Sequence, residues 1–150
     1  MRRQAGFGVI AAIVILVILA SLAAAIVKLG FVEQMSSAQD TLTARATSAA
    51  RAGNEWGLHQ ALKGGWAACV GVVQTLDLSA DTGFQVTVTC NSTLYNEGES
   101  APGIARTVRV YSIDAVACNM PLAAEPKCPN NGAAASPAYV ERRRQVTATN

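Results

Sequence analysis

The chain has 150 residues, of which 51% are hydrophobic and only 15% are charged, and its formal charge at pH 7 is +2. Soluble domains carry about 25% charged residues, so this low share, with a mean hydropathy of +0.25, indicates a segment adapted to a non-aqueous environment. The composition excludes a disordered chain and a strongly basic nucleic-acid-binding protein, and the length excludes a two-lobed enzyme.

An uncharged apolar run occupies residues 7–27. As a helix rising about 1.5 Å per residue, it would extend roughly 31 Å, close to the thickness of the hydrocarbon core of a bilayer. Arg2 and Arg3 precede the run. The positive-inside rule therefore predicts a cytoplasmic amino terminus, one transmembrane helix and a remainder that faces outward.

Three kinds of amino terminus are compatible with such a run. A secretory signal peptide would be cut after Ala25, because Ala23 to Ala25 offer the A-x-A pattern, although the run is longer than the usual apolar region of a signal peptide. An uncleaved single-pass anchor would keep Met1. The third kind depends on the junction between Gly6 and Phe7.

At this junction the basic leader Met-Arg-Arg-Gln-Ala-Gly meets the sequence Phe-Gly-Val-Ile-Ala-Ala-Ile-Val-Ile-Leu. It resembles the amino terminus of type IV prepilins. The resemblance implies that a membrane-bound prepilin peptidase cuts after Gly6 and methylates the new amine of Phe7. It also implies a pilin-like fold, in which one long helix begins in the membrane and continues into a small head.

One position departs from the family, because most pilins carry Glu as the fifth residue of the mature chain and this chain has Ala11. In the family this Glu is thought to pair with the terminal amine of the subunit ahead in the fibre, since a carboxylate in hydrocarbon needs a partner. A foremost subunit has no such partner. Ala11 therefore favours a tip or initiator role; the alternative is a subunit that never enters a fibre.

Residues 28–62 continue the helical pattern, with no proline before Pro102 and small or apolar residues at steps of three and four. Gly64 and Gly65 end the pattern after Lys63, a cation placed favourably in the last turn. The two halves predict one helix of about 55 residues, longer than ordinary globular helices. The expected buried stripe comprises Val32, Met35, Leu42, Ala46, Ala49, Gly53 and Trp56.

The stretch Ala-Arg-Ala-Gly-Asn-Glu-Trp-Gly at residues 50–57 is similar to the A-R-A-G-x-E-W-G signature of the MshP family. These minor-pilin-like proteins serve the biogenesis of mannose-sensitive haemagglutinin (MSHA) pili, and Tyr-Val-Glu-Arg at residues 139–142 matches the same family. Gly53 and Gly57 lie one turn apart beside Trp56, so a strand can approach the helix closely. We expect a packing role for this motif.

Beyond Gly65 the pattern changes to a period of two, which is typical of strands. We expect strands at residues 70–78, 84–90, 106–116 and 139–148, a hairpin loop at 79–83, a polar loop at 96–103 and an irregular excursion at 119–137. The predicted fold class is α+β: a pilin-like, long N-terminal helix, half transmembrane, packed on a small antiparallel β-sheet with disulfide-closed loops.

Four cysteines, Cys69, Cys90, Cys118 and Cys128, follow the apolar run. An even number on the exported side of a membrane implies disulfides, and three pairings are possible. We favour Cys69 with Cys90, which a hairpin would bring together, and Cys118 with Cys128, which would close the last long loop. A zinc site is the alternative, but no pair has the C-x(2–4)-C spacing.

Few residues offer other chemistry. His59 is the only histidine, and no nucleophile lies in a recognisable motif, so we expect no catalysis, no metal and no cofactor. Residues 77–83 place alternate oxygen ligands before a glycine but lack the EF-hand spacing, which favours a hairpin turn over a calcium site. Residues 142–144 are three arginines, but strand alternation sends Arg143 to the opposite face, which favours an arginine-guarded edge strand over a DNA-binding patch.

These observations predict a leader at residues 1–6, a transmembrane half-helix at 7–27, an amphipathic half-helix at 28–63 and a β-rich head at 66–150. They favour a minor-pilin-like subunit of MSHA-type pilus biogenesis, held in the bacterial inner membrane by a single pass with its head in the periplasm. The expected partners are other pilins, the inner-membrane assembly platform, the prepilin peptidase and membrane lipid, and not nucleic acid. The alternatives are a tip-type pseudopilin of a type II secretion system and an exported or membrane-anchored ligand-binding module.

Overall fold

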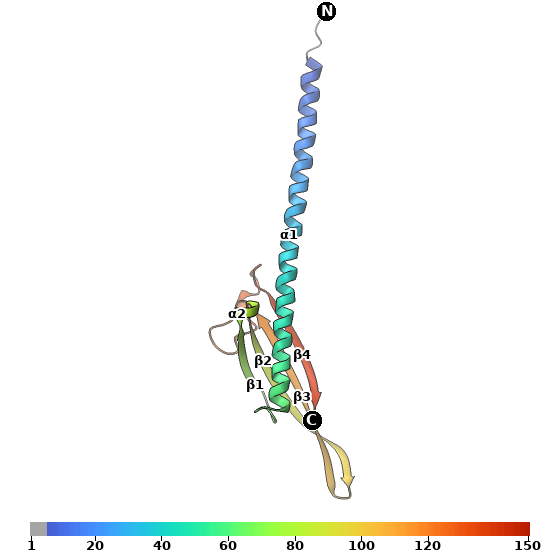
Figure 1. Cartoon of the computed structure of the whole chain (residues 1–150), viewed down its shortest axis with the longest axis vertical. Helices are drawn as coiled ribbons and strands as arrows, with labels where there is room; N and C mark the ends of the chain where they lie inside the picture. Colours follow the sequence, from blue (N-terminus) through green and yellow to red (C-terminus); the bar gives the residue numbers. More distant parts are fainter. Residues whose placement is uncertain (1–5) are drawn as a thin grey trace, which may run out of the picture. The chain divides into compact units, whose positions relative to one another are not determined.

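The computed structural model describes residues 6–150, and at residues 6–7 and 29–33 it describes the backbone alone. Residues 1–5 of the expected leader lie outside it. A long helix, α1, comes first in the chain, and a small β-rich region follows (Figure 1). The chain divides into two compact units, one ending at Asp40 and the other spanning Thr41–Asn150.

Helix α1 runs without a break from Gly6 to Leu62, a length of 57 residues, which confirms the expected continuous helix. Its segment Gly8–Lys28 has a mean hydropathy of 3.1 and is long and apolar enough to cross a membrane. The hydroxyl of Ser21, a polar group within this segment, donates a hydrogen bond of 2.8 Å to the carbonyl of Ile18. The helix therefore satisfies this group without water, as a lipid environment requires.

The end of α1, from Thr41 to Leu62, belongs to the second unit and buries one face against the sheet. The buried residues are Ala46, Ala49, Ala50, Gly53, Asn54, Gly57 and Ala61. The expected stripe is wrong at Met35, which is 60% exposed, and Leu42 and Trp56 are only half-buried. The side chain of Val32 lies outside the described residues. Most of the buried residues are alanine or glycine, and their small side chains let the helix lie close to the strands.

Four strands form one antiparallel sheet in the order β1-β2-β3-β4. Their bounds are Val72–Leu78, Phe84–Ala101, Ile104–Cys118 and Glu141–Thr149. The alternation expected for β2 is confirmed, since Phe84, Val86, Val88 and Cys90 all lie in the core. Tyr111 and Ile113 of β3 complete the layer, and the hydroxyl of Tyr111 donates to the carbonyl of Ala67 at 2.8 Å.

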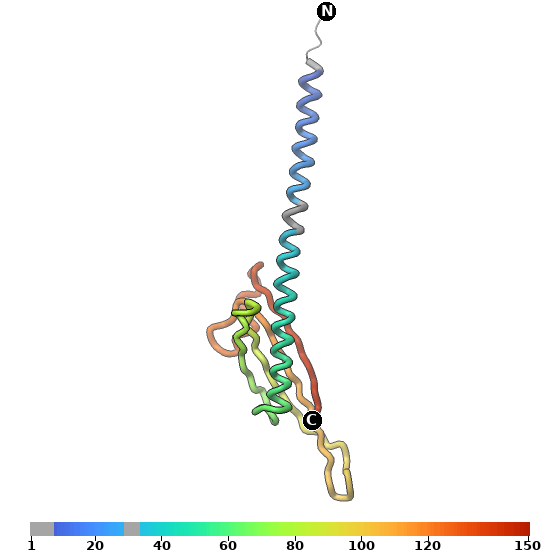
Figure 2. Tube along the Cα trace, in the orientation of Figure 1, coloured from blue at the N-terminus to red at the C-terminus, as the bar shows by residue number. Residues whose placement is uncertain are grey.

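The β2–β3 hairpin is longer than the sequence predicted. Residues 96–103, expected as a polar loop, instead continue the two strands to a turn at Pro102 and Gly103. Strand β1 pairs with β2 only as far as Cys90, and β4 pairs with β3 only from Val110. Residues 91–108, which we call the hairpin arm, therefore extend past the other strands (Figure 2). Gly98 and Gly103, with φ of 107° and 81°, supply the conformations that the irregular register and the turn require.

The two connections also differ from plain loops. Residues 79–82 form one helical turn, α2 (Ser79–Thr82), which ends at Gly83 in the left-handed conformation. The excursion after β3 contains a short 3-10 turn, Asn131–Ala133, and contacts the face of the sheet that α1 does not cover. There the hydroxyl of Thr75 bonds the carboxylate of Glu125, and the amide of Cys128 donates to the hydroxyl of Thr87 at 2.9 Å.

Candidate functional site

The expected processing residues lie at the start of α1. The helix begins at Gly6 and continues through Phe7, and the leader residues before them lie outside the described part. Ala11 is exposed within the apolar segment. From Gly8 to Val27 no residue is ionisable, so this segment offers lipid or a neighbouring apolar helix no charge that needs a partner.

The motif at residues 50–57 forms a close contact between α1 and the sheet. A methyl group added at Gly53 would lie 2.6 Å from Cγ1 of Val86, and one added at Gly57 would lie 2.7 Å from Cγ2 of Ile113. These distances are shorter than any carbon–carbon contact at its optimum. Both glycines therefore serve packing, as the motif led us to expect.

Aromatic residues close the end of this contact. The rings of Trp56 and Trp66 meet edge to face with centroids 4.9 Å apart, a favourable geometry for aromatic pairs. Both side chains are half-buried against the core, whereas His59 is exposed. Trp56 thus packs against Trp66, which lies just after the end of α1.

Two disulfides close loops in the second unit, and they are the two pairs that we favoured. Cys69 pairs with Cys90, and Cys118 pairs with Cys128, each with Cα atoms 5.7 Å apart. All four cysteines are buried. The first bond ties the segment after α1 to β2, and the second ties the excursion to the end of β3.

The turn at residues 77–83 is held by one carboxylate. Asp77 accepts hydrogen bonds from the amide and the hydroxyl of Ser79, at 2.9 Å and 2.5 Å, and from the side chain of Gln85 at 3.3 Å. The bonds from Ser79 lower the pKa of Asp77 below 3.8. The carboxylate therefore holds Ser79, the first residue of α2. The described residues contain no group of three or more His, Cys, Asp or Glu side chains that could hold a metal ion.

The three arginines of β4 separate as strand alternation predicts. Arg143 forms a two-pronged ion pair with Asp114 on the face away from α1, and these hydrogen bonds raise the pKa of Arg143. Arg142 donates instead to the hydroxyl of Thr43 on α1, at 3.1 Å. Arg144 lines a cleft beside α1. The positive charge is thus divided between two faces of the sheet.

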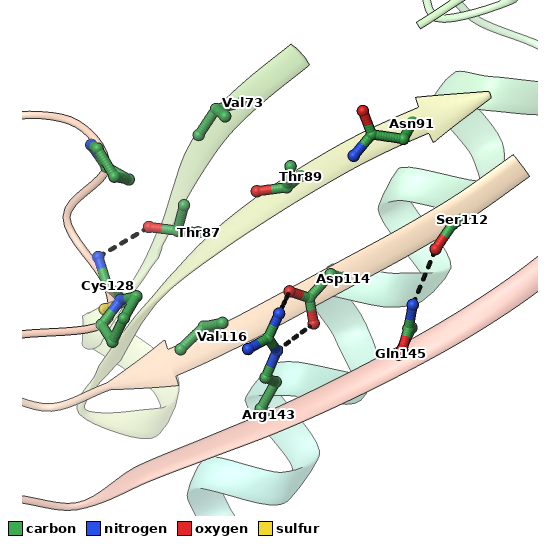
Figure 3. A pocket seen from close by; sticks show the side chains of 12 residues that line it. Val73, Thr87, Thr89, Asn91, Ser112, Asp114, Val116, Cys128, Arg143 and Gln145 are labelled. Atoms are coloured by element: carbon green, nitrogen blue, oxygen red, sulfur yellow. Dashed lines mark hydrogen bonds and ion pairs between the residues drawn. The ribbon is translucent and has the colours of Figure 1, made fainter. Parts of the chain in front are cut away.

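A polar groove of about 380 Å³ lies on the face of the sheet opposite α1 (Figure 3). Figure 3 shows Arg143 facing Asp114, with Gln145 donating to Ser112 at 2.9 Å further along the same two strands. Pro126 of the excursion forms part of the rim. Because the one charged pair in the groove is neutralised, its hydroxyl and amide groups suit a neutral polar ligand better than an ion.

A second cleft, of about 330 Å³, lies between α1 and β4, and we call it the α1–β4 cleft. Arg51 and Glu55 form an ion pair of 3.0 Å along its helical side, and Arg144 lines its strand side. Asn54 is only 8% exposed, and within the described residues its side-chain oxygen receives no hydrogen bond. An acceptor buried in this way requires a donor from elsewhere or carries a cost of about 1–3 kcal/mol.

Sequence reasoning missed both the polar groove and the α1–β4 cleft. A signal for the groove was present in β2, where Gln85, Thr87, Thr89 and Asn91 alternate with the core residues. The cleft carried no such signal, because it depends on which strand lies beside α1.

Comparison with known proteins gives no match, since no family model, no curated protein and no solved structure matches this chain.

Proposed function

We propose that this protein is a minor-pilin-like subunit that serves the biogenesis of an MSHA-type type IV pilus, at the tip or as an initiator of the fibre. One observation carries the proposal. A single unbroken helix contains both a membrane-length apolar segment and a stripe built into the core of a small antiparallel sheet. A removable signal peptide needs no such continuity, whereas a retained docking helix does.

The amino-terminal residues support processing at a defined point. In the proposal the prepilin peptidase cuts after Gly6, Phe7 becomes the methylated first residue, and the segment Gly8–Lys28 stays in the inner membrane. The rest of the chain then faces the periplasm, an oxidising compartment that suits the two disulfides. Other pilins and the assembly platform are the partners of the apolar helix.

Ala11 supports a foremost position. An ionised side chain within the membrane requires a partner, and the first subunit of a fibre has no subunit ahead to supply one. The apolar segment is uncharged from Gly8 to Val27, so it enters the bilayer without this requirement. The role is mechanical: the subunit offers its helix and its head as a template on which the following subunits assemble.

The deciding experiment is mass spectrometry of the native protein purified from its own membrane. A first residue of methylated Phe7, with four hydrogens lost to two disulfides, supports the proposal. An intact Met1 identifies a plain anchor and contradicts it. A first residue of Ile26 identifies a cleaved signal peptide and contradicts it as well.

A pair of variants tests the processing step directly. Gly6→Leu should leave the leader attached and block incorporation into pili, while membrane insertion persists. Gly8→Leu makes the same chemical change two residues further, where an added side chain meets nothing within 4 Å, and should still be trimmed. Normal trimming of Gly6→Leu contradicts the assignment.

A third variant, Ala11→Glu, tests the foremost position. It places a carboxylate without a partner in hydrocarbon, so the number of pili should fall. An unchanged pilus number, counted by electron microscopy, argues against a tip or initiator role.

The polar groove favours a second candidate function, an exported or membrane-anchored module that binds a ligand. Its volume of about 380 Å³ and its neutral lining fit a small polar molecule. The same mass measurement separates the two candidates, because such a module would begin at Met1 or Ile26.

A further inference from the structure

We infer that two copies of this chain dock head to tail, with the tip of the hairpin arm of one copy seated in the α1–β4 cleft of the next. The inference rests on the proposed function, since a subunit that assembles through its apolar helix also needs a contact between the β-rich units. Both halves of this contact lie within residues 41–150.

The cleft has unsatisfied binding groups. The side-chain oxygen of Asn54 is buried without a donor from the described residues, and Arg144 forms no ion pair with them. Leu58 and Val146 supply an apolar patch between these two polar groups. The cleft therefore suits a ligand that carries one hydrogen-bond donor, one anionic group and an apolar body.

The tip of the hairpin arm has the matching groups. Residues 94–105 include two carboxylates, Glu97 and Glu99, and no lysine or arginine. Tyr95 is 53% exposed and carries a hydroxyl donor on an apolar ring. Tyr95 and Glu97 are two residues apart in β2, beside the register shift between Asn96 and Glu99. The tip of the arm thus offers the donor, the ring and the anion within a few residues of one another.

The tip of the arm is exposed. Asn91 and Ser92 at its base bond Gly71 and Cys69, but among the described strands no third strand pairs with residues 91–108. Leu94 and Ile104 are 54% and 59% exposed. Strand β4 pairs only with β3 among the described strands, so its outer edge is open next to the cleft. An exposed strand edge with apolar side chains is a common place for one chain to bind another.

The electrostatic balance favours this pairing. The cleft contains Arg51, Glu55 and Arg144, which leaves one positive charge after the pair of Arg51 with Glu55 is removed. In the arm, Arg106 neutralises part of Glu97 at 3.4 Å, and Glu99 lies near the turn, where it accepts from the amide of Gly103. The excess charges are opposite in sign, which favours encounter and sets the orientation.

A contact between two different patches of one chain is heterologous and does not close on itself in a pair. Each copy that accepts an arm can offer its own arm to another copy. Such a contact is therefore open-ended, and the foremost copy of a row leaves one of its two patches unused.

The test uses the full chain in lipid vesicles and a carbodiimide, which joins an amine to a carboxylate only when the two are in contact. Arg144→Lys keeps the charge and supplies the amine. The expected product is a covalent dimer in which mass spectrometry maps the new amide between residue 144 of one copy and Glu97 or Glu99 of another. No interchain link at residue 144, or a link to a different acidic residue, overturns the inference.

Arg143→Lys is the matched control, because it makes the same change one residue away on the opposite face. It should link to Asp114 of its own chain and not to the arm of a second copy. A dimer through residue 143 and Glu97 or Glu99 means that collision alone explains the products, and this overturns the inference.

Removal of the donor provides a second readout. In the Arg144→Lys background, Tyr95→Phe should lower the dimer yield about fivefold, the effect of losing one hydrogen bond. Leu94→Ala, on the opposite face of the arm, should change the dimer yield little. A dimer yield of Tyr95→Phe equal to that of the parent protein refutes the role given to the hydroxyl.

The first residue of the native protein separates this inference from the proposed function. If the native chain starts at Phe7 and the link at residue 144 is absent, the pilin proposal stands and the contact does not. If the link forms and the native chain keeps Met1, the contact stands and the pilin proposal falls.

Discussion

The close approach of α1 to the sheet can be tested at Gly53. In Gly53→Ala the new methyl group would lie 2.6 Å from Cγ1 of Val86, 3.1 Å from Cβ of Ala115 and 3.2 Å from Cγ2 of Val88. Optimal carbon–carbon contacts are about 3.5–4.0 Å, so Val86, which is fully buried, has to move by about 1 Å. Overpacking of this kind costs about 1–3 kcal/mol.

The helix itself would gain from the same substitution. Alanine is favoured over glycine in a helix interior by about 1 kcal/mol, so the net destabilisation expected for Gly53→Ala is about 0–2 kcal/mol. The control is Ala52→Gly, at an exposed position of the same helix turn. This control measures the difference in helix propensity between alanine and glycine without the packing contact to Val86. It should lower the free energy of unfolding by about 1 kcal/mol.

A double-mutant cycle then isolates the contact. Val86→Ala alone should cost about 2–3 kcal/mol, from two lost methyl groups and the remaining cavity. In combination with Gly53→Ala the added methyl occupies the vacated space, and the two changes should offset each other by about 1–2 kcal/mol.

The assay is urea unfolding of the full chain in detergent micelles, followed by the fluorescence of Trp56 and Trp66, which are the chain's only tryptophans. Both contact the core beside this contact. The reasoning fails if Gly53→Ala is more stable than the wild type, or if the cycle shows no coupling with Val86.

Three further predictions concern the loops around the sheet. Replacement of Cys118 and Cys128 by serine should lower the free energy of unfolding by about 3 kcal/mol under non-reducing conditions, because a short closed loop is released; a urea midpoint equal to that of the wild type would contradict this. Burial, together with the hydrogen bond to Glu141, raises the pKa of Tyr139 from 10.0 to about 12. The protonated phenol therefore stabilises the fold below pH 10, and this stabilisation is lost as the pH rises from 10 to 12. The free energy of unfolding of Tyr139→Phe should lack that decline, and parallel pH profiles of the two proteins would refute the assignment. Because the pKa of Asp77 is lowered below 3.8, its carboxylate stabilises the fold above that pH, and this stabilisation is lost as the pH falls further. The difference in the free energy of unfolding between wild type and Asp77→Asn should therefore shrink below pH 4. A constant difference would show that charge plays no part.

The sequence predicted the helix and the central strands because their patterns are local. The apolar run and the absence of proline before Pro102 were enough to predict a helix that the structure extends to Leu62. Strand β2 was recognised from Phe84 to Cys90, where core and polar residues alternate. Both predictions depend only on the spacing of residues within one element.

The hairpin arm was missed because its residues carry the composition of a loop. Asn96, Gly98, Pro102 and Gly103 are turn-forming residues, and the pairing of Leu94 with Arg109 across the arm is a non-local property. The exposure of Met35 was missed for a related reason. Periodicity places a residue on a face of a helix but does not say how far along the helix the sheet extends.

The candidate sites also divide into features that depend on residues close in sequence and features that depend on residues far apart in sequence. Gly53 and Gly57 could be assigned to packing from their spacing alone, and the two disulfides followed from the expected hairpin and loop. The burial of Asn54 beside Arg144 could not be foreseen, because these two residues are distant in sequence and meet only when β4 lies beside α1.

The placement of the two disulfides makes the four strands unequal in their resistance to opening. The loop closed by Cys69 and Cys90 contains all of β1, and the bond from Cys118 anchors the end of β3. Strand β4 contains no cysteine and lies at the edge of the sheet. Its amides should therefore exchange with solvent deuterium first, at a low free energy of local opening, while β1 remains tethered. The sheet would thus release its last strand, reversibly, before any other of its strands comes apart.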